Sequence, residues 1–119
     1  MHFQRPPMNH AKLIYLTAGS ITDLLLDLRK SSQSYKKYIA INLSAYRHAL
    51  FIPSGIAHGF KVNNDNTTVI YNQSSVYSKK YDDGILWNSF GVDWPVKNPT
   101  LSERDKNFVK WDDFITPFK

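Results

Sequence analysis

Hydrophobic and polar residues alternate along much of the chain before Ser78, and a period of two residues indicates β-strands. Residues typical of turns, Gly19-Ser20 and Asn63-Asn64-Asp65-Asn66, separate the alternating runs. Short strands at such regular spacing are typical of a β-sandwich or a β-barrel. The pattern therefore predicts an all-β fold whose clear strands are Ala11–Ala18, Ile21–Arg29, Tyr38–Leu43, Ala49–Ile52, His58–Val62 and Thr67–Gln73.

The alternation weakens after Ser78. Gly84–Trp87 is a candidate for one further short strand, and Leu101–Asn107 and Trp111–Phe114 are expected to form helical turns. Ser102 is a suitable N-cap for the first of these turns. Because neither a repeat nor a linker interrupts the 119 residues, we expect a single domain over residues 1–119.

The segment His2-Phe3-Gln4 stands at the start of the sequence with no strand before it. One edge of the sheet is therefore expected to be missing or to come from a second chain. Exposed strand edges invite pairing with another chain. We accordingly expect a homodimer.

Charged residues on two of the strands have more than one interpretation. Lys12 shares a strand face with Ile14 and Leu16. It either extends along the sheet rim or points into a barrel mouth, where it would stabilise a developing oxyanion. Asp23 and Asp27 share one face of the next strand, and they are either exposed or orient a histidine inside the barrel.

Composition narrows the class of protein. A hydrophobic fraction of 42% and an aromatic fraction of 14% fit an ordinary globular domain. No run approaches the ~20 apolar residues of a membrane span, and the N-terminal residues lack the apolar stretch of a signal peptide. With no cysteine, the chain has no thiolate nucleophile, disulfide or cysteine-type zinc site. We expect a soluble, cytoplasmic protein that does not bind membranes.

The formal net charge of +5 raises the question of a polyanionic partner. The basic residues are scattered, and the close pairs are only Arg29-Lys30, Lys36-Lys37 and Lys79-Lys80. No basic helix or nucleic-acid recognition motif is present. The charge therefore disfavours nucleic acid and suits a small anionic substrate, such as a nucleotide sugar.

Four histidines are candidates for chemistry. His58 lies three residues after Gly55, in a strand that follows a Pro53-x-Gly55 corner, and His2 is followed by Phe-Gln. His10 and His48 lie in polar or proline-rich connections and are expected to be solvated. Because the chain has no His-x-His and a single glutamate, a metal site is disfavoured.

The spacing Pro-x-Gly-x-x-His resembles the second conserved motif of cupin β-barrels. Taken together, the motifs resemble dTDP-4-dehydrorhamnose 3,5-epimerase and related nucleotide-sugar epimerases over nearly the whole chain. The segments that carry the resemblance are His2-Phe3-Gln4, Ala11–Leu13, Asp23–Arg29, Leu43–Ala45, Phe51–Phe60, Tyr71, Gly84–Asn88, Gly91–Pro95 and Leu101–Asp105.

This resemblance implies a cupin-type jelly-roll barrel, a homodimer and no metal or organic cofactor. It implies epimerisation of a dTDP-linked 4-keto-6-deoxy-hexose at C3, C5 or both, in rhamnose-type deoxysugar biosynthesis. By the same resemblance, four residues stand at the family's catalytic positions. His2 is the base and Asp105 is its carboxylate partner. Lys12 stabilises the enolate oxygen, and Tyr71 is the acid. The family's substrate-binding positions match His58, Asp82 and Arg104.

Two features depart from the family pattern. Met1 stands where the family has a leucine inside a longer chain, so the N-terminal strands, an arginine before the histidine and an arm that reaches the partner subunit have no counterpart. Val76 stands where many relatives have an aromatic residue. A non-catalytic cupin-fold protein that binds sugar nucleotides or supports assembly is the alternative function, and a metal-dependent cupin is a third.

Overall fold

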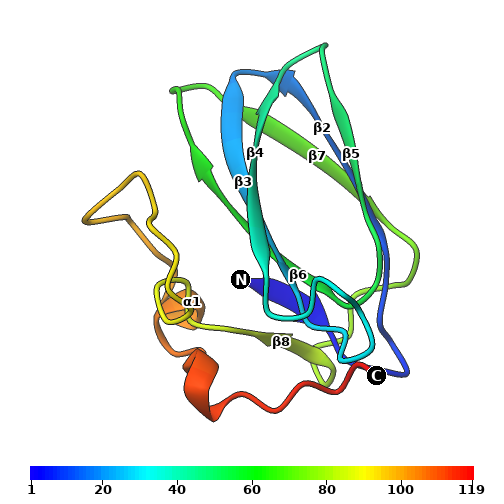
Figure 1. Ribbon diagram of the computed structural model, residues 1–119. Coiled ribbons are helices and arrows are strands. Elements are labelled where there is room, and N and C mark those ends of the chain that lie inside the picture. The colour runs from blue at the N-terminus through cyan, green and yellow to red at the C-terminus, as the bar shows by residue number, and fades with distance from the viewer.

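The computed structural model describes all residues from 1 to 119 and consists mainly of two antiparallel β-sheets that face each other (Figure 1). The all-β prediction is confirmed, and the cupin-like jelly roll that the resemblance implies is confirmed with it. None of the helices is long and apolar enough to cross a membrane. The elements are β1 (His2–Gln4), β2 (Lys12–Ala18), β3 (Ser20–Asp27), β4 (Tyr38–Ser44), β5 (Ala49–Ile52), β6 (Ile56–Val62), β7 (Thr68–Gln73), β8 (Asp82–Gly84), α1 (Glu103–Lys106) and the 3-10 helix η1 (Trp111–Asp113).

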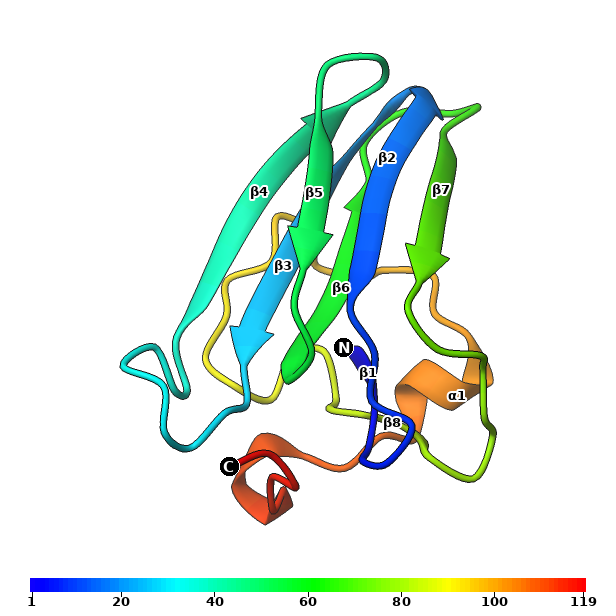
Figure 2. The same ribbon diagram turned by 90° about the vertical axis from the view of Figure 1, so that its right-hand side faces the viewer.

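The five-stranded sheet has the order β4-β3-β6-β1-β8, and the three-stranded sheet has the order β5-β2-β7. The strands β5, β2 and β7 lie side by side in Figure 2. In the larger sheet, β1 places His2 opposite His58 of β6 on one side and opposite Gly84 of β8 on the other. The N-terminal strand β1 therefore lies inside the sheet, paired on both sides.

All six clear strands of the sequence pattern form, with ends that move by at most two residues. The expected strand Gly84–Trp87 is wrong in position, because β8 covers Asp82–Gly84. Asp-Asp-Gly is a poor strand sequence, so β8 depends on its pairing with β1 rather than on propensity. A Cβ on Gly84 would lie 2.5 Å from the Phe108 ring and 2.7 Å from the Met1 carbonyl oxygen, so this close approach requires glycine.

The two expected helical turns are confirmed. Ser102 is the N-cap of α1, and its hydroxyl oxygen accepts a hydrogen bond of 3.1 Å from the amide of Asp105. The second turn is η1, which starts at Trp111 as expected. Because α1 follows this cap directly, the charged side chains of Arg104 and Asp105 are presented from a short, anchored turn.

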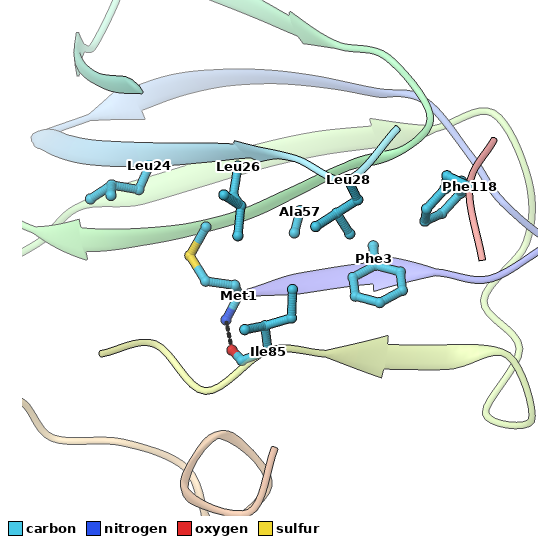
Figure 3. Packing of buried hydrophobic residues seen from close by; sticks show 8 residues of the cluster. All are labelled: Met1, Phe3, Leu24, Leu26, Leu28, Ala57, Ile85 and Phe118. Atoms are coloured by element: carbon cyan, nitrogen blue, oxygen red, sulfur yellow. Dashed lines mark hydrogen bonds between the residues drawn. The ribbon is translucent and has the colours of Figure 1, made fainter. Parts of the chain in front are cut away.

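Strand β3 is buried on both faces, because one face packs between the sheets and the other packs under β1 and the C-terminal segment. Figure 3 shows Leu24, Leu26 and Leu28 pointing toward β1, where they join a buried cluster. Ile21, from the opposite face, joins the cluster between the two sheets. The first cluster contains Met1, Phe3, Leu24, Leu26, Leu28, Ala57, Ile85 and Phe118, and the second contains Ile14, Leu16, Ile21, Leu43 and Ile52.

Asp27 ends β3 and organises the loop that follows. Neither expected role of Asp27 is correct, since its side chain is buried and contacts no histidine. Its carboxylate accepts hydrogen bonds from Arg29 Nε at 3.0 Å and Nη2 at 2.8 Å, and from the hydroxyls of Ser32 and Ser34 at 2.7 and 2.6 Å. Burial opposes the charged form, but these donors outweigh it and hold the pKa of Asp27 well below its usual range.

Candidate active site

A cavity of about 760 Å³ opens beside β1, β6 and β7 and is closed on one side by the segment from Trp94 to Asp105. Its lining is mixed, with aromatic side chains and several ionisable groups, as is typical of ligand sites. The structure brings every catalytic and substrate-binding position that the family resemblance implies to this cavity: His2, Lys12, His58, Tyr71, Asp82, Arg104 and Asp105.

His2 lies at the start of β1, and each of its ring nitrogens contacts another side chain. Nε2 lies 2.5 Å from Oδ1 of Asp105, and Nη2 of Arg104 lies 2.6 Å from Nδ1. A guanidinium group can only donate hydrogen bonds, so Nδ1 of His2 must be the unprotonated nitrogen. Nε2 therefore carries the proton and donates it to Asp105, which gives a neutral imidazole with a defined tautomer.

The electrostatics of this pair keep the imidazole neutral and the carboxylate charged. Burial lowers the pKa of His2 from 6.5 to about 4, and the nearby Asp105 opposes this shift without cancelling it. Burial would raise the pKa of Asp105, but hydrogen bonds from Ser102 and His2 lower it. At neutral pH, His2 is therefore able to accept a proton, and Asp105 is able to stabilise the imidazolium that would form.

Lys12 points inward from β2 and is only 6% exposed, so the rim position is wrong and the inward position is confirmed. It forms no salt bridge. Burial lowers the pKa of Lys12 from 10.5 to about 8, although Asp23 and Asp82 oppose the shift. An unpaired buried cation in a cavity is expected where negative charge appears on a bound ligand.

His58 projects from β6 next to a fully buried carboxylate. Its Nδ1 lies 3.3 Å from Oδ1 of Asp23, whose side chain is 0% exposed. Burial lowers the pKa of His58, and Asp23 opposes the shift. For Asp23, the expectation that an acidic residue of β3 orients a histidine inside the barrel is confirmed.

Arg104 links two parts of the cavity, because its Nη2 also lies 2.8 Å from Oδ2 of Asp82. Burial raises the pKa of Asp82, and Arg104 opposes that shift. Tyr71 on β7 is 53% exposed and lines the cavity from the three-stranded sheet. A phenol, a guanidinium and a carboxylate thus surround the same space as the His2–Asp105 pair.

The sequence interpretation was wrong for His10 and right for His48. His48 is exposed, whereas His10 is buried and lines the cavity. His10 lies in phase with Lys12 and Ile14, and this alternation, extended two residues before the strand, would have predicted that it points inward. Trp87 and Trp94 also line the cavity, although the sequence pattern gave no role to either ring.

The arrangement suits proton transfer next to a carbonyl group. A neutral imidazole held by a carboxylate can remove a proton, an unpaired ammonium group can stabilise the resulting oxyanion, and a phenol can return a proton. The structure brings together no group of three or more histidine, cysteine, aspartate or glutamate side chains that could hold a metal ion.

Comparisons with known proteins agree with this chemistry. A family model described as dTDP-4-dehydrorhamnose 3,5-epimerase matches residues 1–113. The protein of that name from Shigella flexneri is 41% identical over 97% of this chain and 67% of its own length. A solved structure of the Bacillus anthracis enzyme of that name, with TDP and PPi bound, is 39% identical and superposes with a TM-score of 0.88 over 92% of this chain and 64% of its own.

A Legionella pneumophila dTDP-6-deoxy-D-glucose-3,5-epimerase in complex with dTDP-4-keto-L-rhamnose is also similar, with 25% identity and a TM-score of 0.86. The match covers 96% of this chain and 62% of that one. The chain therefore spans about two thirds of the length of these relatives.

Proposed function

This chain belongs to the dTDP-4-dehydrorhamnose 3,5-epimerase family, and we propose that it epimerises a dTDP-linked 4-keto-6-deoxy-hexose. The observation that carries the proposal is the neutral His2, held by Asp105 in the cavity that also contains the unpaired Lys12. The ligands named for the relatives, TDP and dTDP-4-keto-L-rhamnose, support a nucleotide-sugar substrate. The net charge of +5 suits such an anionic substrate.

In the proposed reaction, His2 removes a proton from C3 or C5, next to the C4 ketone. The electrons of the broken C–H bond form a C=C bond, and those of the C=O bond move to the oxygen, which becomes an enolate. Lys12 stabilises this oxyanion. Tyr71 then donates a proton to the opposite face of the same carbon, which inverts the centre and restores the ketone.

For His2 to act as the base, one contact seen in the structure must change. Nε2 of His2 is bonded to Asp105, so the incoming proton must bind to Nδ1, which Arg104 covers. Arg104 therefore moves from Nδ1 to the substrate when the substrate binds. A phosphate oxygen is a suitable new partner because guanidinium groups bind phosphates strongly. His58 and Asp82 complete the proposed substrate-binding set.

Homodimer formation and a cytoplasmic location remain predictions of this proposal, and so does the assignment of residues 1–119 to one domain. The three-stranded sheet supports association, because β5 and β7 are its edge strands. Leu13 and Phe51 are cross-strand partners and are 40% and 64% exposed. Light scattering on the purified protein measures the molecular mass and would contradict the dimer if it returned that of one chain.

The test of the activity is proton NMR of dTDP-4-keto-6-deoxy-glucose in D₂O with this protein. We expect deuterium to enter at C3, C5 or both, and the exchanged position defines the type of epimerase. His2→Ala should slow the exchange by about 10²–10⁴-fold, the range for loss of a general base. The matched control, His48→Ala, removes an exposed histidine and should leave the rate unchanged.

A folded protein that bound the sugar nucleotide without exchanging any proton would refute the epimerase and favour a binding or assembly role. Exchange that survived in His2→Ala would refute the assignment of the base.

A further inference from the structure

One buried side-chain polar atom of this chain has no hydrogen-bond partner, and it belongs to a residue that lines the cavity. It is Nε2 of His10, a residue that is only 8% exposed and that the proposed reaction does not use. Buried polar side-chain atoms nearly always have a partner, so each exception needs an explanation. Because His10 lines the cavity, a ligand bound in the cavity is an explanation that fits.

The backbone on both sides of His10 is held by hydrogen bonds. The loop therefore cannot easily swing the ring into solvent. The carbonyl oxygen of Met8 accepts hydrogen bonds from Gln4 Nε2 at 2.6 Å and from Ser75 Oγ at 3.0 Å. Beyond His10, β2 begins at Lys12 and is paired on both sides. His10 is therefore fixed between a pinned loop and a central strand.

The tautomer of His10 follows from the same contacts. Ser75 has one hydroxyl proton, and Ser75 Oγ donates it to Met8. The remaining contact, 3.5 Å between Ser75 Oγ and Nδ1 of His10, therefore needs a proton on Nδ1. Nε2 is then the unprotonated nitrogen and acts only as an acceptor. Burial, with Lys12 nearby, lowers the pKa of His10 to about 4, so the ring stays neutral at neutral pH.

We propose that Nε2 of His10 accepts a hydrogen bond from a hydroxyl group of the substrate's hexose ring. This inference rests on the proposed function, because it concerns the same cavity and the same substrate class. A diphosphate or a ketone oxygen offers no proton to an acceptor, whereas the hydroxyls at C2 and C3 do. His10 shares a strand face with Lys12, so a hydroxyl close to the C4 ketone falls within this part of the cavity.

This bond makes His10 a residue that positions and selects the sugar. It would hold the ring carbons at a fixed distance from His2 while Lys12 binds the ketone oxygen. A ligand that lacks the contacted hydroxyl would leave a buried acceptor unpaired, which is a strong basis for discrimination.

The test compares His10→Leu, which removes the acceptor, with His10→Gln, whose amide oxygen can still accept a bond. In the D₂O exchange assay, His10→Leu should lower kcat/KM about tenfold, as expected for one lost hydrogen bond. His10→Gln should retain most of the rate, and His48→Leu is the matched control. The inference is overturned if His10→Leu exchanges as fast as the wild-type protein.

Substrates that lack the C2 or the C3 hydroxyl identify the donor. With one of the two analogues, the kcat/KM of the wild-type protein should fall about tenfold. With that same analogue, the kcat/KM of His10→Leu should fall no further, because the substitution has already removed the partner of the missing hydroxyl. Equal losses for both proteins with each analogue would contradict the contact.

A binding measurement separates this inference from the activity and from any folding defect of the variants. In the wild-type protein, the nitrogen NMR signal of His10 Nε2 should be that of an unprotonated ring nitrogen, and it should shift when dTDP-6-deoxy-glucose, which has no ketone, is added. This shift is expected even if no proton exchange is ever detected. An unmoved signal with the ligand bound, or a proton on Nε2 in the free protein, would overturn the inference.

Discussion

Asp27 and Asp23 lie four residues apart on one strand, both are buried, and their surroundings differ completely. Asp27 accepts hydrogen bonds from the side chains of Arg29, Ser32 and Ser34, all within a few residues of the chain. Asp23 has only two long contacts, of 3.3 and 3.4 Å, both to Nδ1 of His58, which lines the cavity. All the side chains of the Asp27 network are paired with one another, whereas the cavity contains groups without protein partners.

This difference separates residues that stabilise the fold from residues that we propose bind the ligand. A fully satisfied buried network specifies the structure around it, while an unpaired buried group destabilises the folded protein. Lys12 and His10 belong to the second kind, because one forms no salt bridge and the other has an unpartnered nitrogen. Substitutions in the cavity and in the Asp27 network should therefore have opposite effects.

Among the substitutions that test this difference, a large effect is expected first for Lys12→Met, which removes the unpaired cation and retains most of the side chain's length. Loss of the oxyanion partner should slow deuterium exchange by about 10²–10³-fold. The folded state should become no less stable, because a buried charge without a partner is replaced by an apolar side chain. Urea unfolding of the two proteins checks this, and a clear loss of stability in Lys12→Met would break the comparison.

Asp27→Asn should show the reverse behaviour. The amide loses the charge that faces Arg29 and cannot accept every bond that the carboxylate accepts, which should destabilise the fold by about 2–3 kcal/mol. Exchange per folded molecule should change by less than about threefold, because the loop lies outside the cavity. Urea unfolding and the exchange assay on the same sample provide both values.

The deprotonation of Lys12 should make the free energy of unfolding depend on pH in the alkaline range. Its pKa is about 8 in the folded protein and 10.5 when unperturbed, so the unfolded chain binds more protons between these values. Stability should therefore rise as the pH increases from about 8 toward 10.5, and this gain should be absent in Lys12→Met. Unfolding free energies at pH 7, 9 and 10 test it, and a gain of the same size in Lys12→Met would contradict it.

The exchange rate should follow a bell-shaped pH profile. It should rise through about pH 4 as His2 loses its proton and fall above about pH 8 as Lys12 does. A rate that did not fall above about pH 8 would contradict the role of protonated Lys12 in the mechanism.

The smallest effect is expected for Ser102→Ala at the start of α1. The variant loses the helix cap and the 2.6 Å hydrogen bond to Oδ2 of Asp105. We expect a loss of about 1 kcal/mol in the free energy of unfolding and a rate lower by a few-fold, because Asp105 is held less firmly. Thermal unfolding and the exchange assay check the two values, and an unchanged rate would show that Asp105 needs no such support.

The sequence predicted the regular part of this structure and not its long-range contacts. The strands β2 and β3 show clear alternation, so the sequence predicted their faces directly and their ends to within two residues. The strand β1 has only three residues and forms because β6 and β8 pair with it on both sides, which no local pattern reveals.

The site shows the same division. Alternation placed Lys12, Ile14 and Leu16 on one face, and extending it by two residues would have placed His10 there as well. The contact between His2 and Asp105 joins residues 103 positions apart, so only the family resemblance could predict it. The bond from Arg104 to Nδ1 of His2 was not predictable, because it depends on where α1 packs against β1.

The most direct test of the central claim is the deuterium exchange rate of two matched variants, Asp105→Asn and Asp27→Asn. Each replaces a buried or half-buried carboxylate by its amide. We expect Asp105→Asn to lose about 10²-fold or more, because the imidazolium of His2 is no longer stabilised, and Asp27→Asn to keep its rate per folded molecule. Equal rates in the two variants would contradict the division of this barrel into a structural network and a reactive cavity.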